Sequence, residues 1–275
     1  MPEVTEPVDD SVVHEQPVSL KGMVPPVAVE LVGVHKLLSG RQVLDGLSLQ
    51  VYKGETFAII GGSGQGKSVT LKHIVGLMSA DRGDVRVNGQ RVDTNNGIDS
   101  IRTQIGYLFQ EGALLKSINV FENVALPLRE HETLTEAQVR ERVMEKLSLV
   151  RLSDAAQKMP GQLSGGMRKR AGLARAIVRN PSIVLYDEPT SGLDPVTSST
   201  INDLILDLQK KVGVTGILVT HDMSSAFRVA HRMGMLLNGR LIKVGTPGEF
   251  KATEDPVVKQ FILGESEGPL TQEAP

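Results

Sequence analysis

One glycine-rich stretch, residues 61–68, combines the groups that bind phosphate. It has the sequence Gly-Gly-Ser-Gly-Gln-Gly-Lys-Ser, which fits the pattern of glycine, any four residues, glycine, lysine and a hydroxyl residue. Backbone N–H groups of such a turn surround phosphate oxygens, while the lysine reaches the β and γ phosphates and the hydroxyl ligates Mg²⁺. The alternative, a glycine-rich turn without function, is disfavoured because a strand pattern precedes the stretch and a helical pattern follows it. The residues expected to contact a nucleotide here are Gly61, Gly62, Ser63, Gly64, Gln65, Gly66, Lys67, Ser68 and Val69.

A pair of acidic residues narrows the chemistry, which phosphate binding alone leaves open among kinases, GTPases, recombinase-like motors and transporter ATPases. Asp187 and Glu188 follow the apolar run Ile183–Tyr186, and open α/β sheets place ligands at the carboxyl ends of strands. Asp187 suits the Mg²⁺ shell, and Glu188 could orient and deprotonate an attacking water as general base. The alternative is that both acids cap the next helix, where carboxylates are favoured.

A second pair of glycines opens a basic helix. Leu163–Met167 has the sequence Leu-Ser-Gly-Gly-Met, and Ser164 is expected to cap the helix. Gly165 and Gly166 are poor helix formers that let a backbone approach something closely, so this helix end suits a phosphate offered by a second subunit. We expect the basic residues of the helix to form a solvated face rather than a nucleic-acid site. They are Arg168, Lys169, Arg170, Arg175 and Arg179.

The elements that must position these residues alternate between strand and helix. Several of the apolar runs lack alternation, which predicts strands buried on both faces of a mainly parallel α/β sheet. The predicted strands are Val27–Val34, Thr56–Ile60, Ile105–Phe109, Ile183–Tyr186, Gly216–Thr220 and Gly234–Leu237. The predicted helices are Lys67–Met78, Glu136–Leu149, Gly165–Arg179 and Val196–Lys211.

Two Asn-Gly pairs, at residues 88–89 and 238–239, predict hairpin turns, so antiparallel β structure is attached to the parallel core. Residues from about 112 to 179 show no strand pattern, which predicts an inserted α-helical subdomain. We expect an ATPase domain over residues 28–250 and a C-terminal extension over 251–275. Residues 1–27 are acidic and rich in proline, which is typical of a disordered tail.

Composition excludes several classes of protein. The chain has 275 residues, 40% of them hydrophobic, and a net charge of -2, so no global field gathers nucleic acid. The absence of cysteine excludes disulfides and thiolate metal sites. No apolar run approaches the ~18 residues of a membrane span, and the acidic N-terminus lacks the pattern of a signal peptide. We expect a cytosolic protein that reaches a membrane only through a partner.

The glycine-rich loop, Leu163–Met167 and the acid pair, taken together in this order, resemble the ATP-binding cassette ATPases over about residues 27–250. The resemblance implies an ATP-hydrolysing homodimer that uses Mg²⁺, in which the loop of one subunit and Ser164, Gly165 and Gly166 of the other enclose ATP. It also implies that Gln110 senses Mg²⁺ and the attacking water, and that His221 holds the γ-phosphate. The loop Ser191–Asp194 would cross between subunits, with Asp194 at the nucleotide of the partner.

One position departs from the family pattern. Members of the family stack adenine on an aromatic residue before the second strand, and Leu38 stands at about that position here. Leu38 can give apolar contact without a π face, so we expect it to touch the base and selectivity for the nucleotide to be loose.

The stretches Leu108–Glu130 and Phe261–Leu270 resemble the Mla branch of the family. Those ATPases energise phospholipid movement between the membranes of Gram-negative bacteria, which implies membrane permease subunits, partners with mammalian-cell-entry (Mce) domains, small accessory subunits and a peripheral place on the cytoplasmic side of the inner membrane. Gly112–Leu115 would then accept a coupling helix of the permease; the alternative is a buried core segment. A transporter for another cargo, such as a lipoprotein, a drug or a small solute, and a soluble assembly scaffold stay open as alternatives. Fifty-four residues follow His221, too few for the regulatory barrel of sugar importers.

Overall fold

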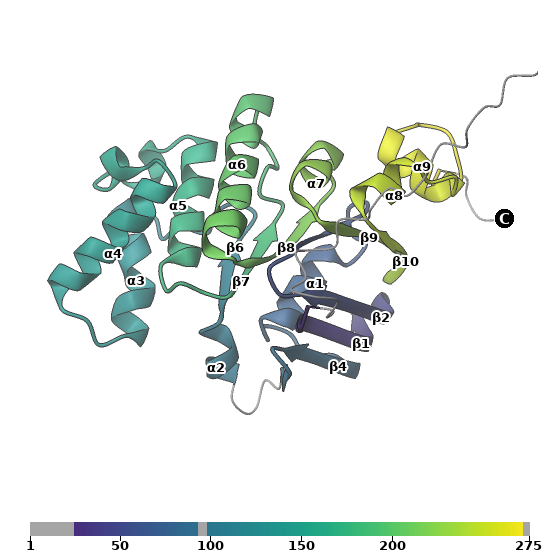
Figure 1. Ribbon diagram of the computed structural model, residues 1–275, viewed down its shortest axis with the longest axis horizontal. Coiled ribbons are helices and arrows are strands. Elements are labelled where there is room, and N and C mark those ends of the chain that lie inside the picture. Colours follow the sequence, from purple (N-terminus) through teal and green to yellow (C-terminus); the bar gives the residue numbers. More distant parts are fainter. Residues whose placement is uncertain (1–24, 93–97, 272–275) are drawn as a thin grey trace, which may run out of the picture.

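A six-stranded, mainly parallel sheet forms the centre of the protein (Figure 1). The computed structural model describes residues 25–92 and 98–271, so most of the predicted tail at 1–27 lies outside the described residues. Five strands of this sheet run parallel and the edge strand β10 runs antiparallel. In spatial order they are β10 (Arg240–Gly245), β9 (Arg232–Leu237), β3 (Thr56–Ile60), β8 (Thr215–Thr220), β7 (Ile183–Asp187) and β6 (Ile105–Leu108).

The central strands β3, β7 and β8 are buried at every residue. Their alternate side chains enter two different hydrophobic clusters, one on each face of the sheet. Ala58 and Ile60 of β3 pack with the helices, whereas Phe57 and Ile59 pack with the antiparallel sheet and α1. A strand covered on both faces has no polar side, which is why the sequence shows an unbroken apolar run.

A smaller antiparallel sheet lies at one end of the molecule (Figure 1). Its strands, in spatial order, are β2 (Arg41–Tyr52), β1 (Val27–Leu38), β4 (Arg82–Val87) and β5 (Gln90–Arg91). Strand β2 is not among the predicted strands, although Leu47, Leu49 and Val51 alternate with polar residues and are buried. Period-two alternation of this kind is the signal of a strand with one exposed face.

Both predicted Asn-Gly hairpin turns are confirmed. Asn88 and Gly89 have φ values of 47° and 79°, and Asn238 and Gly239 have 49° and 76°. They join β4 to β5 and β9 to β10. Positive φ at both central residues is what a two-residue hairpin of this type requires.

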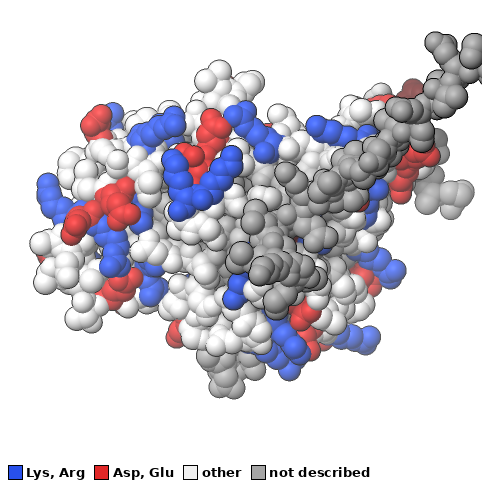
Figure 2. Space-filling view, viewed as in Figure 1, with Lys and Arg blue, Asp and Glu red and all other residues white. Residues whose placement is uncertain are grey.

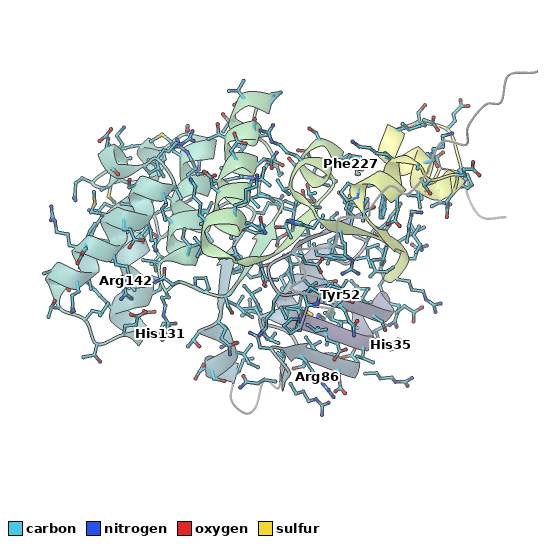
Figure 3. The ribbon with its side chains drawn as sticks, viewed as in Figure 1. His35, Tyr52, Arg86, His131, Arg142 and Phe227 are labelled. Carbon is cyan, nitrogen blue, oxygen red and sulfur yellow. The ribbon has the colours of Figure 1, made fainter. Side chains whose placement is uncertain are left out.

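Three helices are inserted between β6 and β7, at the opposite end of the molecule from the antiparallel sheet (Figure 1). They are α3 (Val120–His131), α4 (Glu136–Leu149) and α5 (Gly165–Ile177). The described chain has no strand between residues 112 and 179, as predicted. Asn119 caps α3, and Thr135 forms a capping box with Gln138 at the start of α4. In Figure 3, His131 and Arg142 mark this insertion, while His35 and Arg86 mark the antiparallel sheet.

Of the remaining helices that the structure describes, four lie between strands of the two sheets in the sequence, and two come after β10. They are α1 (Lys67–Ile74), α2 (Ile98–Arg102), α6 (Pro195–Val212), α7 (Met223–Val229), α8 (Pro247–Lys251) and α9 (Pro256–Leu263). Helix α1 is shorter than predicted because Gly76, at a φ of 67°, follows its C-cap Val75 and turns the chain away. None of the helices in the described ranges is long and apolar enough to span a membrane. On the face shown in Figure 2, the described basic and acidic side chains are interspersed.

Candidate active site

The glycine-rich loop connects β3 to α1 and holds Lys67 at its end. The Lys67 side chain is 7% exposed, and its Nζ donates to the carbonyl oxygens of Gly61 and Gly62 at 2.8 and 2.9 Å. Burial lowers the pKa of Lys67, and the nearby Glu188 carboxylate opposes that shift. Gly66 has a φ of 103°, and a Cβ there would lie 2.8 Å from the Val43 carbonyl oxygen, so only glycine fits.

Ser68 and Asp187 form a pair of oxygen donors beside the loop. Ser68 Oγ donates to Asp187 Oδ1 at 2.7 Å, and the hydroxyl of Tyr107 donates to Asp187 Oδ2 at 3.0 Å. A hydroxyl and a carboxylate suit Mg²⁺, which takes one or two protein ligands together with substrate phosphates and water. No cluster of three or more His, Asp or Glu able to hold a metal occurs in the described part of the chain. The Ser68 hydroxyl and the Asp187 carboxylate are the donor types that a Mg²⁺ arriving with a nucleotide would need.

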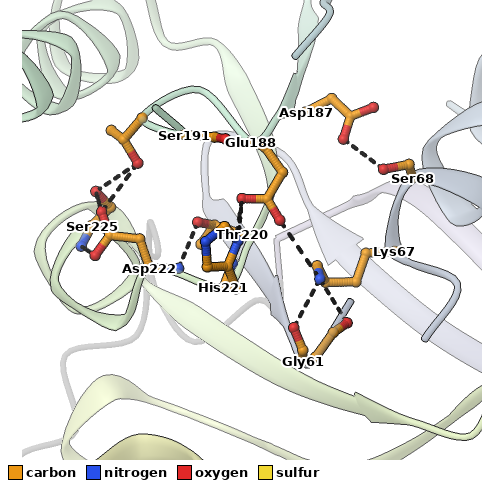
Figure 4. A network of polar contacts seen from close by, with 12 residues as sticks. Gly61, Lys67, Ser68, Asp187, Glu188, Ser191, Thr220, His221, Asp222 and Ser225 are labelled. Carbon is orange, nitrogen blue, oxygen red and sulfur yellow. Dashed lines mark hydrogen bonds and ion pairs between the residues drawn. The ribbon is translucent and has the colours of Figure 1, made fainter. Parts of the chain in front are cut away.

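Glu188 lies at the centre of the polar network in Figure 4. Its Oε2 is 2.9 Å from His221 Nδ1, and its Oε1 is 3.6 Å from Lys67 Nζ. Its backbone has a φ of 47°, the left-handed region that residues other than glycine seldom adopt. Asp187 and Glu188 do not cap the next helix, because Asp194 is the N-cap of α6. The alternative interpretation of the acid pair is therefore wrong.

A cavity of about 350 Å³ brings most of the predicted nucleotide residues together from five parts of the chain, whereas Gly61, Gly62 and Gln65 are not among its lining. Leu38 comes from the end of β1, Gln110 follows β6, Glu188 follows β7 and His221 follows β8. Its lining is Leu38, Val43, Ser63, Gly64, Gly66, Lys67, Ser68, Val69, Gln110, Glu188 and His221. Gln65 points elsewhere in this structure, because its Oε1 accepts from the backbone N–H of Asn238. The cavity has the residue types to hold a nucleotide with its phosphates on the loop.

The residues expected to serve a second subunit do not line this cavity. Ser164 caps α5, where its Oγ accepts from Met167 N at 3.3 Å. Asp194 caps α6 and accepts from the backbone N–H groups of Val196 and Thr197. Gly166 packs against Thr197 so closely that a Cβ would lie 2.3 Å from its Cγ2. These groups stand at the ends of two neighbouring helices, and their place beside a partner's nucleotide stays a prediction.

The expectation that the basic residues of α5 form a solvated face is wrong except at Arg168, which is exposed. Lys169 is 5% exposed, and its Nζ donates to the backbone oxygens of Glu188 and Ser191. Arg175 donates to the carbonyl oxygens of Gly112 and Ala113. The other three basic residues also donate to protein oxygens. Arg168 donates to Leu163, Arg170 to Val150 and Arg151, and Arg179 to the carboxylate of Glu132. Helix α5 is packed into the molecule, so its basic residues bind the loops around it.

Tyr107 and a polar cluster next to His221 were not predicted from the sequence. Ser225 Oγ donates to Asp222 Oδ2 at 2.6 Å and lies 3.2 Å from the Thr190 hydroxyl. Asp222 N donates to the Thr220 hydroxyl at 2.9 Å. The only advance signal for Tyr107 was a hydroxyl within the apolar strand before Gln110, since its partner Asp187 is 80 residues away.

Comparisons with known proteins show which family the chain resembles as a whole. The family model described as ABC transporter matches residues 44–191. A probable ribonucleotide transport ATP-binding protein, mkl, of Mycobacterium leprae is 42% identical over 246 residues, which are 89% of this chain and 71% of that protein. The intermembrane phospholipid transport system ATP-binding protein MlaF of Haemophilus influenzae is 40% identical, over 84% of this chain and 88% of its own. An ATP-binding cassette solved as a dimer with ADP and phosphate, in a post-hydrolysis state, superimposes with a TM-score of 0.73 at 32% identity, over 80% of this chain and 98% of its own.

Proposed function

The chain belongs to the ABC transporter family as an ATPase subunit, and we propose that its transporter moves phospholipid between the inner and outer membranes. The predicted α/β fold with attached antiparallel and helical parts is the ABC ATPase fold. We retain residues 28–250 as the ATPase domain, 112–179 as its helical subdomain and 251–275 as the C-terminal extension.

In this proposal, three side chains that line the cavity carry out the hydrolytic step. Lys67 holds its ammonium over the loop, where it would meet the phosphate oxygens bound by the loop N–H groups. The Glu188 carboxylate would orient and deprotonate the water that attacks the terminal phosphate. His221 Nδ1 lies 2.9 Å from Glu188 Oε2, where it would fix the direction of the carboxylate.

Mg²⁺ would be held by Ser68 and Asp187, and by Gln110, which lines the same cavity as Ser68. When bound, it would neutralise charge on the phosphates. The Tyr107 hydroxyl orients the Asp187 carboxylate by donating to Oδ2, the oxygen that Ser68 does not contact. Leu38 and Val43 give the base apolar contact, which supports loose selectivity among nucleotides.

Cassettes of this family dimerise and work with membrane permeases. We propose that two copies of this chain enclose ATP between the loop of one and Ser164, Gly165, Gly166 and Asp194 of the other. The helix ends of α5 and α6, which lie outside the cavity of their own chain, support this arrangement. Backbone N–H groups at a helix start suit a phosphate.

A second cavity of about 580 Å³ lies between β6 and the inserted helices, and Tyr107, Phe109, Ala113 and Pro127 are among its lining residues. Leu115, two residues after Ala113, is 46% exposed, which favours a surface over a core position for residues 113–115. We propose that this groove receives the permease, so that the ATPase is peripheral on the cytoplasmic side of the inner membrane. The complex would include Mce-domain and small accessory subunits and no nucleic acid.

The observation that supports phospholipid as cargo is the similarity to MlaF over 88% of its length. The mkl relative, whose name states ribonucleotide transport, makes a nucleotide the second candidate cargo. The test is to purify the native complex through a tag on this chain, identify its other subunits by mass spectrometry and extract bound small molecules. We expect a permease, an Mce-domain subunit and phospholipid. A complex with a permease and with a bound ribonucleotide other than the ATP or ADP of the cassettes, but with neither an Mce-domain subunit nor phospholipid, would overturn the lipid proposal.

A further inference from the structure

Lys169 lies beneath the turn that contains the proposed general base. It comes from α5, is 5% exposed, and places its Nζ 2.9 Å from the carbonyl oxygen of Glu188 and 2.7 Å from that of Ser191. Lys169 is absent from the lining of the nucleotide cavity. Its ammonium therefore faces the backbone of residues 188–191 rather than the nucleotide.

The turn Glu188–Ser191 needs support from outside itself. Glu188 is held at a φ of 47°, and a residue with a Cβ in this region persists only where the surroundings impose it. Ser191 N donates to Glu188 O at 3.2 Å, which closes the turn, and Glu188 N donates to Val219 O in β8. Lys169 adds donors to the two carbonyls at the ends of the turn.

The same helix contacts the chain beyond the turn. A Cβ on Gly165 would lie 3.3 Å from Leu193 Cδ2, and one on Gly166 would lie 2.3 Å from Thr197 Cγ2. Helix α5 thus touches residues 188–197 at several points between its N-cap Ser164 and Lys169. A displacement of α5 would move the backbone that carries Glu188.

We propose that Lys169 is a positioning residue for ATP hydrolysis, because it fixes the Glu188 turn on α5 and keeps the carboxylate between Lys67 and His221. This inference rests on the proposed role of Glu188 as general base. Burial lowers the pKa of Lys169 to about 8, although Glu188 and Glu111 oppose the shift. Burying an ammonium is unfavourable, so two hydrogen bonds at one turn indicate a specific use.

The test compares Lys169→Met, which keeps the length without donors, with Lys169→Gln, which restores an uncharged donor. Lys146→Met is the matched control, because Lys146 is also a buried lysine of the helical insertion but bonds to the exposed Glu145. We expect kcat of Lys169→Met to fall about 10-fold to 100-fold, as small misplacements of reacting groups do. Affinity for N-methylanthraniloyl-ATP should change less than about twofold, since no nucleotide contact is lost. Lys169→Gln should recover part of kcat, and Lys146→Met should keep the wild-type value.

Wild-type kcat in Lys169→Met, or an equal loss of nucleotide affinity and kcat, would overturn the inference. If Lys169→Met does not fold, Lys169→Gln decides: a folded chain with reduced kcat and normal affinity supports positioning, and normal kcat shows that the lysine serves stability alone. Glu188→Gln measured in parallel separates the two proposals. If Glu188→Gln is inactive and Lys169→Met is fully active, only the proposed role of Lys169 is refuted. If Glu188→Gln is active, the proposed role of Glu188 as general base is refuted.

Discussion

The Glu188 carboxylate and the His221 imidazole meet at the carboxyl ends of two paired parallel strands. Glu188 Oε2 lies 2.9 Å from His221 Nδ1 and 3.4 Å from the backbone N–H of His221. Because β7 and β8 pair with Asp187 opposite Val219, the residues that follow them lie at one edge of the sheet. The contact leaves Oε1 facing Lys67 (Figure 4). One carboxylate thus connects the proposed phosphate lysine to the histidine.

Glu188→Gln should reduce ATP hydrolysis by ~10² to 10⁴, because an amide keeps the shape of the carboxylate but cannot take a proton from water. Nucleotide binding should survive, since Lys67, Ser68 and Asp187 are unchanged, and ATP-bound dimers should accumulate. Steady-state ATPase and ATP-dependent dimerisation measure the two effects. Glu254→Gln, at an exposed position, is the control. Near-wild-type turnover in folded Glu188→Gln would remove Glu188 from the mechanism.

Mixing Lys67→Ala chains with Gly165→Asp chains should restore ATPase activity, although each variant alone is inactive. In a mixed dimer, the intact loop of one chain meets the intact helix start of the other, so one of two composite sites is complete. Random mixing should therefore recover about a quarter of the wild-type sites in a two-fold pair. A mixture of Lys67→Ala with the Lys67→Ala, Gly165→Asp double variant has no intact site and should stay inactive. Mixed dimers that form without activity would contradict a shared site with independent turnover.

Tyr107→Phe should raise the Mg²⁺ concentration for half-maximal ATPase by up to about tenfold, because groups that orient a metal ligand tune its affinity. The lost hydroxyl donates to Asp187 Oδ2 at 3.0 Å. Tyr186→Phe, which removes a hydroxyl from the buried strand position next to Asp187, is the control. Electron paramagnetic resonance of Mn²⁺ with ATP reports metal binding without turnover. Unchanged Mg²⁺ and Mn²⁺ requirements would show that Tyr107 does not tune the metal site.

His73→Gln should make the thermal stability less sensitive to acid. Burial lowers the pKa of His73 below its ordinary value of 6.5, with Lys36 acting in the same direction and Asp81 in the opposite one. The unfolded chain therefore binds the proton more readily than the folded chain. The contribution of neutral His73 to the free energy of unfolding is thus complete above pH 6.5 and is lost as the pH falls below that value. His231 shifts in the same direction, so the substitution should reduce this fall rather than abolish it.

Melting temperatures between pH 7.5 and about pH 5 test this prediction. The control is His131→Gln, at an exposed position of α3, which keeps His73 and should follow the wild-type curve. Parallel acid dependence of the wild type and His73→Gln would show that another group controls the loss of stability.

The sequence by itself predicted the helices, strands and turns that depend only on residues close together in the chain. Strand β3 and helix α4 have the predicted bounds. Strand β3 is a short apolar run before glycines, and the structure shows that α4 begins after a threonine-glutamine capping box. The Asn-Gly turns at 88 and 238 were predicted from their need for positive φ. The phosphate loop could be identified for the same reason, since its eight residues are contiguous and their chemistry follows from their own backbone.

Only the tertiary structure decided what lies beside Glu188 and Asp187. Tyr107 is 80 residues from Asp187, and Lys67 is far in sequence from Glu188; their contacts exist because β6, β7, β8 and β3 share one sheet. The basic pattern of α5 predicted solvent exposure, yet Lys169 is buried because loops pack around the helix. Periodicity tells which face of an element is apolar, whereas the partner of a buried amine or hydroxyl depends on which distant segment the fold brings to it.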